Sequence, residues 1–160
     1  MTESGKSVDN TLMAPLAELH PETLAVVTAV VAFTLAAFIV LFRTGMKKYA
    51  GLLRWAAGDA AIGCAFLSYT FFRDYPGNGR FIVSNAFMVL ALSTIVSGLR
   101  AFCGKSSDRG ALVFLPAPLF VMVGLWIDRT WGSRQLVDAA VSGFLAFQCA
   151  AAALALKACD

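Results

Sequence analysis

The 160-residue chain has few charges and almost none of the residues that build metal centres. Only 14% of its residues are charged, against about a quarter in an ordinary soluble domain, and His20 is its single histidine. Its four cysteines contain no C-x-x-C pair, so we expect packing residues rather than a zinc site or a disulfide framework. The sequence therefore predicts no metal site and indicates no cofactor.

Catalytic motifs are also missing. The chain has no G-x-S-x-G elbow, no Walker loop and no H-E-x-x-H helix, and all its glutamates lie within the first 22 residues. Its 13 Lys and Arg residues are spread among short loops, which excludes the basic face that nucleic acids require. We therefore expect neither an enzyme nor a nucleic-acid-binding protein.

Hydrophobic residues make up 59% of the chain, and its mean hydropathy is +0.73. A helix needs about 20 apolar residues to cross about 30 Å of hydrocarbon. Such runs are predicted at residues 23–42, 50–72, 81–98, 111–127 and 136–156. The prediction is an all-α, polytopic transmembrane bundle of five spans occupying residues 23–160, with the lipid bilayer as its first partner.

Two segments carry further expectations. Residues 1–22 form an extramembrane leader that is either a short interfacial helix or a disordered tail. Pro118 lies inside the fourth run and should kink it, because proline removes a backbone donor.

The distribution of basic residues predicts the orientation. With the N-terminus outside, the inner loops hold more Lys and Arg than the outer ones, including a cluster directly after the first run. These inner residues are Arg43, Lys47, Lys48, Arg100, Lys105, Arg109 and Lys157. We therefore expect N-out and C-in, and a multi-pass protein of a bacterial cytoplasmic membrane.

Small residues form stripes on two of the predicted helices. The second run carries Gly51, Gly58, Ala61, Ala65 and Ser68, and the fifth carries Ala139, Gly143, Ala146, Ala150 and Ala153. Small residues let membrane helices approach closely. Each stripe is either the seam of a homodimer or a packing surface inside one bundle, with the second use expected for at least one of them.

Three polar residues are predicted inside the membrane. Arg54 lies one turn from the inner boundary and should extend to the headgroups. Asp59 and Gln148 are predicted at similar depth near the bilayer centre, where facing one another would satisfy both. Asp59 is a proton carrier, a ligand-binding group or a structural polar contact.

Asn85 and Asp138 are predicted near the outer boundary. They are candidates for an outward-facing ligand pocket with Ser84 and Trp131 at its rim, and ordinary boundary hydrogen bonding is the alternative.

The stretch from Leu53 to Phe102 carries a family pattern. It contains Leu53-Arg54-Trp55-Ala56-Ala57-Gly58, a loop with Pro76, Ser84-Asn85-Ala86, and Gly98-Leu99-Arg100-Ala101-Phe102. This order resembles the N-terminal multi-helix membrane sensory region of bacterial diguanylate cyclases. The cyclase signature Gly-Gly-Asp/Glu-Glu-Phe does not occur, so the resemblance implies a sensory module whose output domain lies elsewhere, attached near Lys157.

Three functions are therefore expected of this sequence. The first is a membrane-embedded sensory or regulatory module that transmits a signal to a cytoplasmic output and is expected to form a homodimer. The second is a small structural or accessory subunit of a membrane complex, with other membrane subunits as partners. The third is a proton-linked transporter that uses Asp59.

Overall fold

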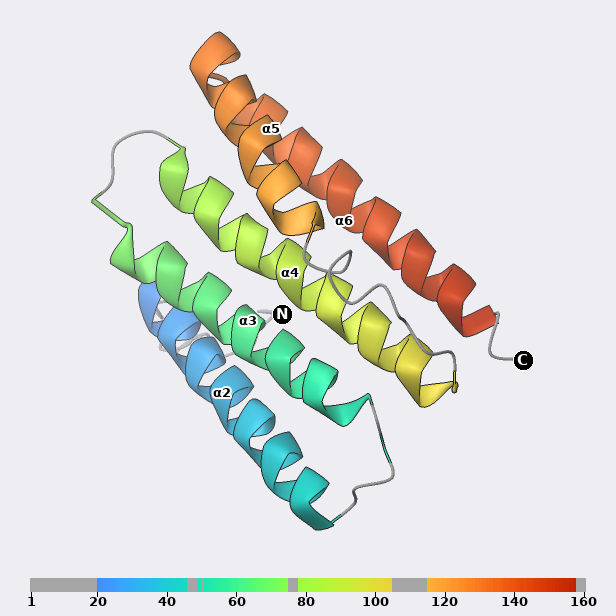
Figure 1. Ribbon diagram of the computed structural model, residues 1–160. Coiled ribbons are helices and arrows are strands. Elements are labelled where there is room, and N and C mark those ends of the chain that lie inside the picture. The colour runs from blue at the N-terminus through green and yellow to red at the C-terminus, as the bar shows by residue number, and fades with distance from the viewer. Residues whose placement is uncertain (1–19, 46–48, 50, 75–77, 105–114, 158–160) are drawn as a thin grey trace, which may run out of the picture.

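The computed structural model describes residues 20–45, 49, 51–74, 78–104 and 115–157, without the side chains of 151–152 and 155–156. Within these ranges it contains five α-helices and no strand (Figure 1). The helices are α2 (Pro21–Gly45), α3 (Leu52–Phe71), α4 (Gly79–Phe102), α5 (Pro116–Trp131) and α6 (Arg134–Lys157). The predicted all-α fold is confirmed, and each predicted run corresponds to one helix. The leader helix considered above lies outside the described residues.

Helix α5 differs most from its predicted run. It begins at Pro116, so both Pro116 and Pro118 lie in its first turn, where a missing N–H breaks no intrahelical bond. The predicted kink at Pro118 is therefore wrong. The helix ends at Trp131 and is capped by Gly132, whose φ of 58° is left-handed and whose N–H donates to Asp128 O; α6 starts at Arg134.

Helices α2, α3 and α4 lie side by side, with α3 in the middle, and α5 and α6 pack on the other side of α4 (Figure 1). Over the first two thirds of α2, an alanine on each turn is buried against α3, which places the two backbones close together. These residues are Ala25, Ala29, Ala32 and Ala36. Across this contact, the Phe33 ring packs on Gly63.

A second core joins α4, α5 and α6. Its buried members are Ile82, Val89, Phe120, Val137 and Val141. The rings of Phe120 and Phe144 meet edge to face with their centroids 5.8 Å apart, a favoured geometry for aromatic pairs. Helix α4 thus contributes to both halves of the molecule.

Two helices, α2 and α4, are long and apolar enough to cross a membrane by length and composition. Helix α2 leaves large apolar side chains exposed along its whole length, such as Leu24 (59%), Phe38 (57%) and Leu41 (65%). A soluble protein buries such a surface, so an unpartnered apolar helix of this kind needs lipid or another protein around it.

The cysteines do not all behave as expected. Cys64 and Cys149 are free thiols, whereas Cys103 is disulfide-bonded, so the expectation that the cysteines only fill space is wrong for Cys103.

Candidate functional site

A close contact joins the start of α3 to the end of α4, near Arg100. A Cβ atom added to Gly51 would meet the carbonyl oxygen of Gly98, and one added to Gly98 would meet the indole of Trp55. About two helical turns further along α3, a Cβ on Gly58 would lie 3.1 Å from Ala91 O. Glycine is required where backbones approach this closely.

Arg54 bonds to α4 at the same contact. Its Nη1 donates to the carbonyl oxygen of Ser97 at 3.1 Å and to Ser97 Oγ at 2.8 Å. The guanidinium thus forms a polar contact between helices. The prediction that Arg54 extends to the headgroups is therefore wrong. Next to it, Trp55 Nε1 is buried without an acceptor among the described residues.

An aromatic cavity of about 520 Å³ lies beside this contact. The Phe102 ring stacks on Tyr49 and Trp55, with centroids 5.4 and 6.1 Å apart. The remaining lining consists of Leu35, Phe38, Ile39, Phe42 and Leu52. Within this lining only Tyr49 and Trp55 carry polar atoms, so the cavity has little with which to orient a ligand.

A more polar cavity, of about 480 Å³, lies at the opposite end of α2, α3 and α4, and we call it the Asn85 cavity. It is lined by Pro21, Leu24, Ala25, Thr28, Phe66, Tyr69, Phe81, Ser84, Asn85 and Met88. Asn85 Nδ2 donates to Phe81 O, which leaves the amide oxygen as an acceptor. Ser84 Oγ donates to Ala65 O and keeps its lone pairs. This combination of an apolar lining and a few polar groups is typical of small-molecule sites.

Positive charge gathers around two rings of this lining. The Arg80 guanidinium carbon lies 5.5 Å from the Tyr69 ring centroid and 4.7 Å from that of Phe81. The Arg134 guanidinium lies 4.2 Å from the same Phe81 centroid. Arg80 makes no ion pair within the described ranges, whereas Arg134 approaches Asp138 at 3.8 Å. The ring of Phe81 therefore holds two cations close to the Asn85 cavity.

The structure brings together only some of the residues predicted for the outward-facing pocket. Asn85 and Ser84 line one cavity together, but Asp138 lies on α6 and faces Arg134, and neither it nor Trp131 belongs to that lining. Trp131 ends α5 and is 65% exposed. The sequence did not identify Tyr69 or Arg80, because an arginine in a short loop carries no signal that aromatic rings will hold it.

The predicted pair between Asp59 and Gln148 is not formed. Gln148 Nε2 donates to Val89 O at 3.1 Å and to Ser93 Oγ at 2.7 Å, while its Oε1 is buried without a partner. The reason is the position of α4, which separates α3 from α6. Asp59 forms no hydrogen bond or ion pair with any described residue, and lies on the α3 face between Trp55 and Phe66.

The two small-residue stripes have opposite environments. On α3, Gly51, Gly58, Ala61 and Ala65 are buried within the bundle. On α6, Ala139, Gly143, Ala146 and Ala150 are exposed, and a Cβ added to Gly143 would meet nothing within 4 Å. The α3 stripe is a packing surface inside one chain, as expected for at least one of the two.

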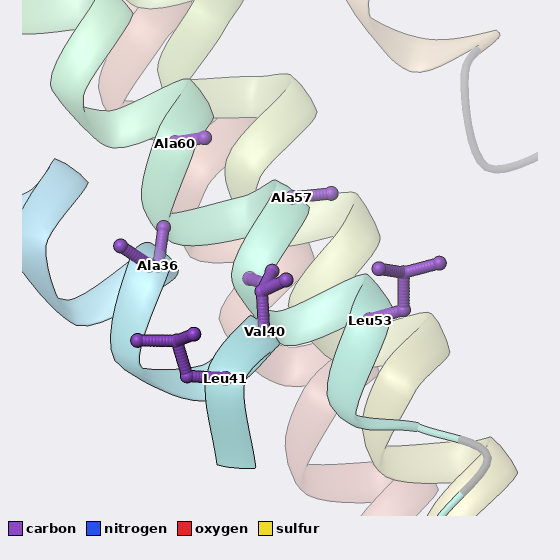
Figure 2. A pocket seen from close by; sticks show the side chains of 8 residues that line it. Ala36, Val40, Leu41, Leu53, Ala57 and Ala60 are labelled. Carbon is purple, nitrogen blue, oxygen red and sulfur yellow. The ribbon is translucent and has the colours of Figure 1, made fainter. Parts of the chain in front are cut away.

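A third cavity, of about 580 Å³, is purely apolar. Figure 2 shows its lining, which comes from α2 and α3 and consists of Ala36, Ala37, Val40, Leu41, Leu53, Ala56, Ala57 and Ala60. Within the described ranges, no three His, Cys, Asp or Glu side chains gather to hold a metal ion.

Comparison of the chain with models of protein families, with curated proteins and with solved structures gave no match. The functional argument therefore rests on the residues and their geometry.

Proposed function

We propose that the chain is a five-span membrane protein that acts as a sensory or regulatory module, without catalytic activity of its own. The exposed apolar surface of α2 supports the membrane placement, because exposing a continuous apolar surface of this kind to water is unfavourable. The ends of α2, α4 and α6 carry Arg43, Arg100 and Lys157 in their last turns. In a bundle of antiparallel neighbours these residues lie at one end, which supports the N-out and C-in orientation.

The observation that carries the sensory proposal is the position of the Asn85 cavity relative to α6. Asn85 and Met88 of α4 line the cavity. Val89 and Ser93 lie within the next two turns of α4. Both accept hydrogen bonds from the side-chain amide of Gln148 on α6. A ligand in the cavity thus acts on α4 next to its buried polar contact with α6.

Signal transfer then follows from a shift between two packings of α6 on α4. Helix α6 is buried along a narrow strip that includes Val137, Val141 and Gln148, and its other faces are open. A ligand shifts the equilibrium to the extent that it binds one packing better than the other. The C-terminal end of α6 would carry that shift to a cytoplasmic output, in line with the resemblance to membrane sensory regions.

Distances between spin labels test the proposal in nanodiscs made with native lipid. Labels at Phe42 and Leu154, both exposed, report the position of α6 relative to α2 after the native cysteines are replaced. We expect two distance populations, whose ratio changes in Gln148→Leu and with lipid extracts added to the protein. A single distance that neither change affects would contradict a sensory role.

The open stripe on α6 favours a second candidate, a subunit of a larger complex, because it offers close packing to any partner helix. In the sensory proposal the partner is a second copy of this chain. Gly143→Leu should then abolish the homodimer seen by native mass spectrometry. Gly45→Leu, at another glycine with open space around it, is the control and should leave the dimer intact. Copurification of other polypeptides in fixed ratio, lost in Gly143→Leu, would favour the subunit instead.

No contact supports the third function, a transporter. Asp59 lines none of the three cavities described above.

A further inference from the structure

We propose that the Asn85 cavity binds an anionic amphiphile, a molecule with a carboxylate or phosphate head and an apolar chain, and that Arg80 recognises the head. This names the ligand class of the sensory site and so rests on the proposed function for its biological meaning. The binding itself can be measured without any output.

The head group is assigned to Arg80 because of what surrounds that residue. Its guanidinium is held by the rings of Tyr69 and Phe81, and both rings are part of the cavity lining. The guanidinium carbon lies over both rings, and no described residue accepts a hydrogen bond from Arg80, so its N–H groups have no partner within the described ranges. Guanidinium N–H groups pair with carboxylate or phosphate oxygens in a planar, bidentate geometry.

The neighbouring charges favour an anion as well. Arg134 places a second guanidinium on Phe81, and its nearest acid, Asp138, remains 3.8 Å away and exposed. Two other cations lie at this end: Arg73 is already paired with Glu22 at 2.6 Å, and Arg129, in the last turn of α5, does not line the cavity. Arg80 is therefore the cation on the cavity's rings that has no acidic partner among the described residues.

The chain of the ligand is assigned to the interior of the cavity. Leu24, Phe66 and Met88 supply apolar surface from three different helices. Asn85 belongs to the same lining, and its amide Nδ2 is already bonded to Phe81 O. A volume of about 480 Å³ lies within the range of small-molecule sites, so one apolar chain of moderate length is the expected occupant.

Electron paramagnetic resonance with spin-labelled lipids tests the assignment. The full chain is placed in phosphatidylcholine nanodiscs, and the protein-immobilised fraction is compared for a spin-labelled long-chain carboxylate and its methyl ester. We expect the wild type to prefer the carboxylate about tenfold, which corresponds to about 1.4 kcal/mol. Arg80→Gln should lose this preference and Arg80→Lys should keep most of it.

Arg129→Gln is the matched control. It removes one positive charge from the same end of the bundle, on the exposed last turn of α5, without touching the cavity. Equal binding of the carboxylate and the ester by the wild type would overturn the proposal. So would an equal loss of preference in Arg80→Gln and Arg129→Gln, because the effect would then come from general surface charge.

A further measurement, with spin-labelled phosphatidylglycerol, distinguishes a membrane lipid from a free amphiphile as the ligand. Stronger immobilisation of this lipid than of the single-chain carboxylate assigns the site to a membrane lipid, and the reverse order assigns it to a free amphiphile. The two proposals also fail separately. A carboxylate preference with no response of α6 in the distance measurement contradicts the sensory role alone, and a response of α6 without any carboxylate preference contradicts the ligand class alone.

Discussion

One methyl group added at Gly58 should destabilise the bundle, whereas the same group added at Gly143 should not. Both residues lie inside α-helices, so Ala replaces Gly in the same local conformation at each site. An ideal Cβ at Gly58 would lie 2.5 Å from Ile95 Cγ1 and 3.1 Å from both Ala91 O and Thr94 Oγ1. At Gly143 it would meet nothing within 4 Å.

The magnitude follows from the difference between the two sites. Replacing Gly by Ala in a helix interior stabilises it by about 1 kcal/mol, and this effect is common to both variants. Only Gly58→Ala adds overpacking, which costs about 1–3 kcal/mol in a well-packed core. The Ile95 side chain can turn away, but the carbonyl oxygen of Ala91 belongs to the α4 backbone and can move only with its helix. We therefore expect Gly58→Ala to be less stable than Gly143→Ala by about 1–3 kcal/mol.

Unfolding in mixed micelles with increasing dodecyl sulfate, followed by circular dichroism, measures this difference. The protein is kept dilute, so that association through α6 does not contribute. Equal unfolding midpoints for the two alanine variants would refute the packing argument, because a bundle without a tight α3–α4 contact would treat the two positions alike.

Two other contacts give predictions by the same assay. Gln148→Leu should change the free energy of unfolding by less than about 1 kcal/mol, because interhelical hydrogen bonds in membranes average about 0.6 kcal/mol and the change also removes a buried, unpartnered Oε1. Gln148→Ala should cost more through lost packing, and equal costs would show that the polar bonds hold α6. Asn78 Nδ2 donates to Asp128 Oδ1 at 2.6 Å, so Asp128→Ala should cost about 1.5–3 kcal/mol. The double variant with Asn78→Ala should cost little more than Asp128→Ala alone, and additive losses would contradict the pairing.

The helices themselves were predictable from the sequence. Each apolar run became one helix, because apolar length and flanking loops define such segments. The boundaries shifted by a few residues, most clearly at α5, where Pro116 starts the helix. A proline kinks a helix when it lies inside the helix, but not when it lies in the first turn. The apolar run from residue 111 does not indicate where the helix begins, so it could not distinguish these two cases.

The neighbours of each helix were not predictable. The stripes through Gly58 on α3 and Gly143 on α6 look alike as sequences, yet one is buried and the other is open. Which stripe is covered depends on the order of helices in space. The same order explains Gln148, which has α4 rather than Asp59 as its neighbour.

The candidate site was predicted only in part. Asn85 was recognised as a polar residue in an apolar run, and in the structure it lines a cavity. The cation beside that cavity, Arg80, lies over the lining ring of Tyr69; the two residues come from different helices and meet only in the folded chain. A contact between helices leaves no periodic signal in either one, so it has to be seen in the structure.

The unequal lengths of the helices have a consequence for the surrounding lipid. At about 1.5 Å per residue, α2 with its 25 residues is roughly 37 Å long, whereas α5 with 16 residues is roughly 24 Å long. In a bilayer, α2 must tilt to fit and the lipid beside α5 must thin, at a cost of fractions of a kcal/mol per ångström. The two sides of the molecule therefore favour different bilayer thicknesses, and lipids with short chains should gather along α5 while longer ones border α2.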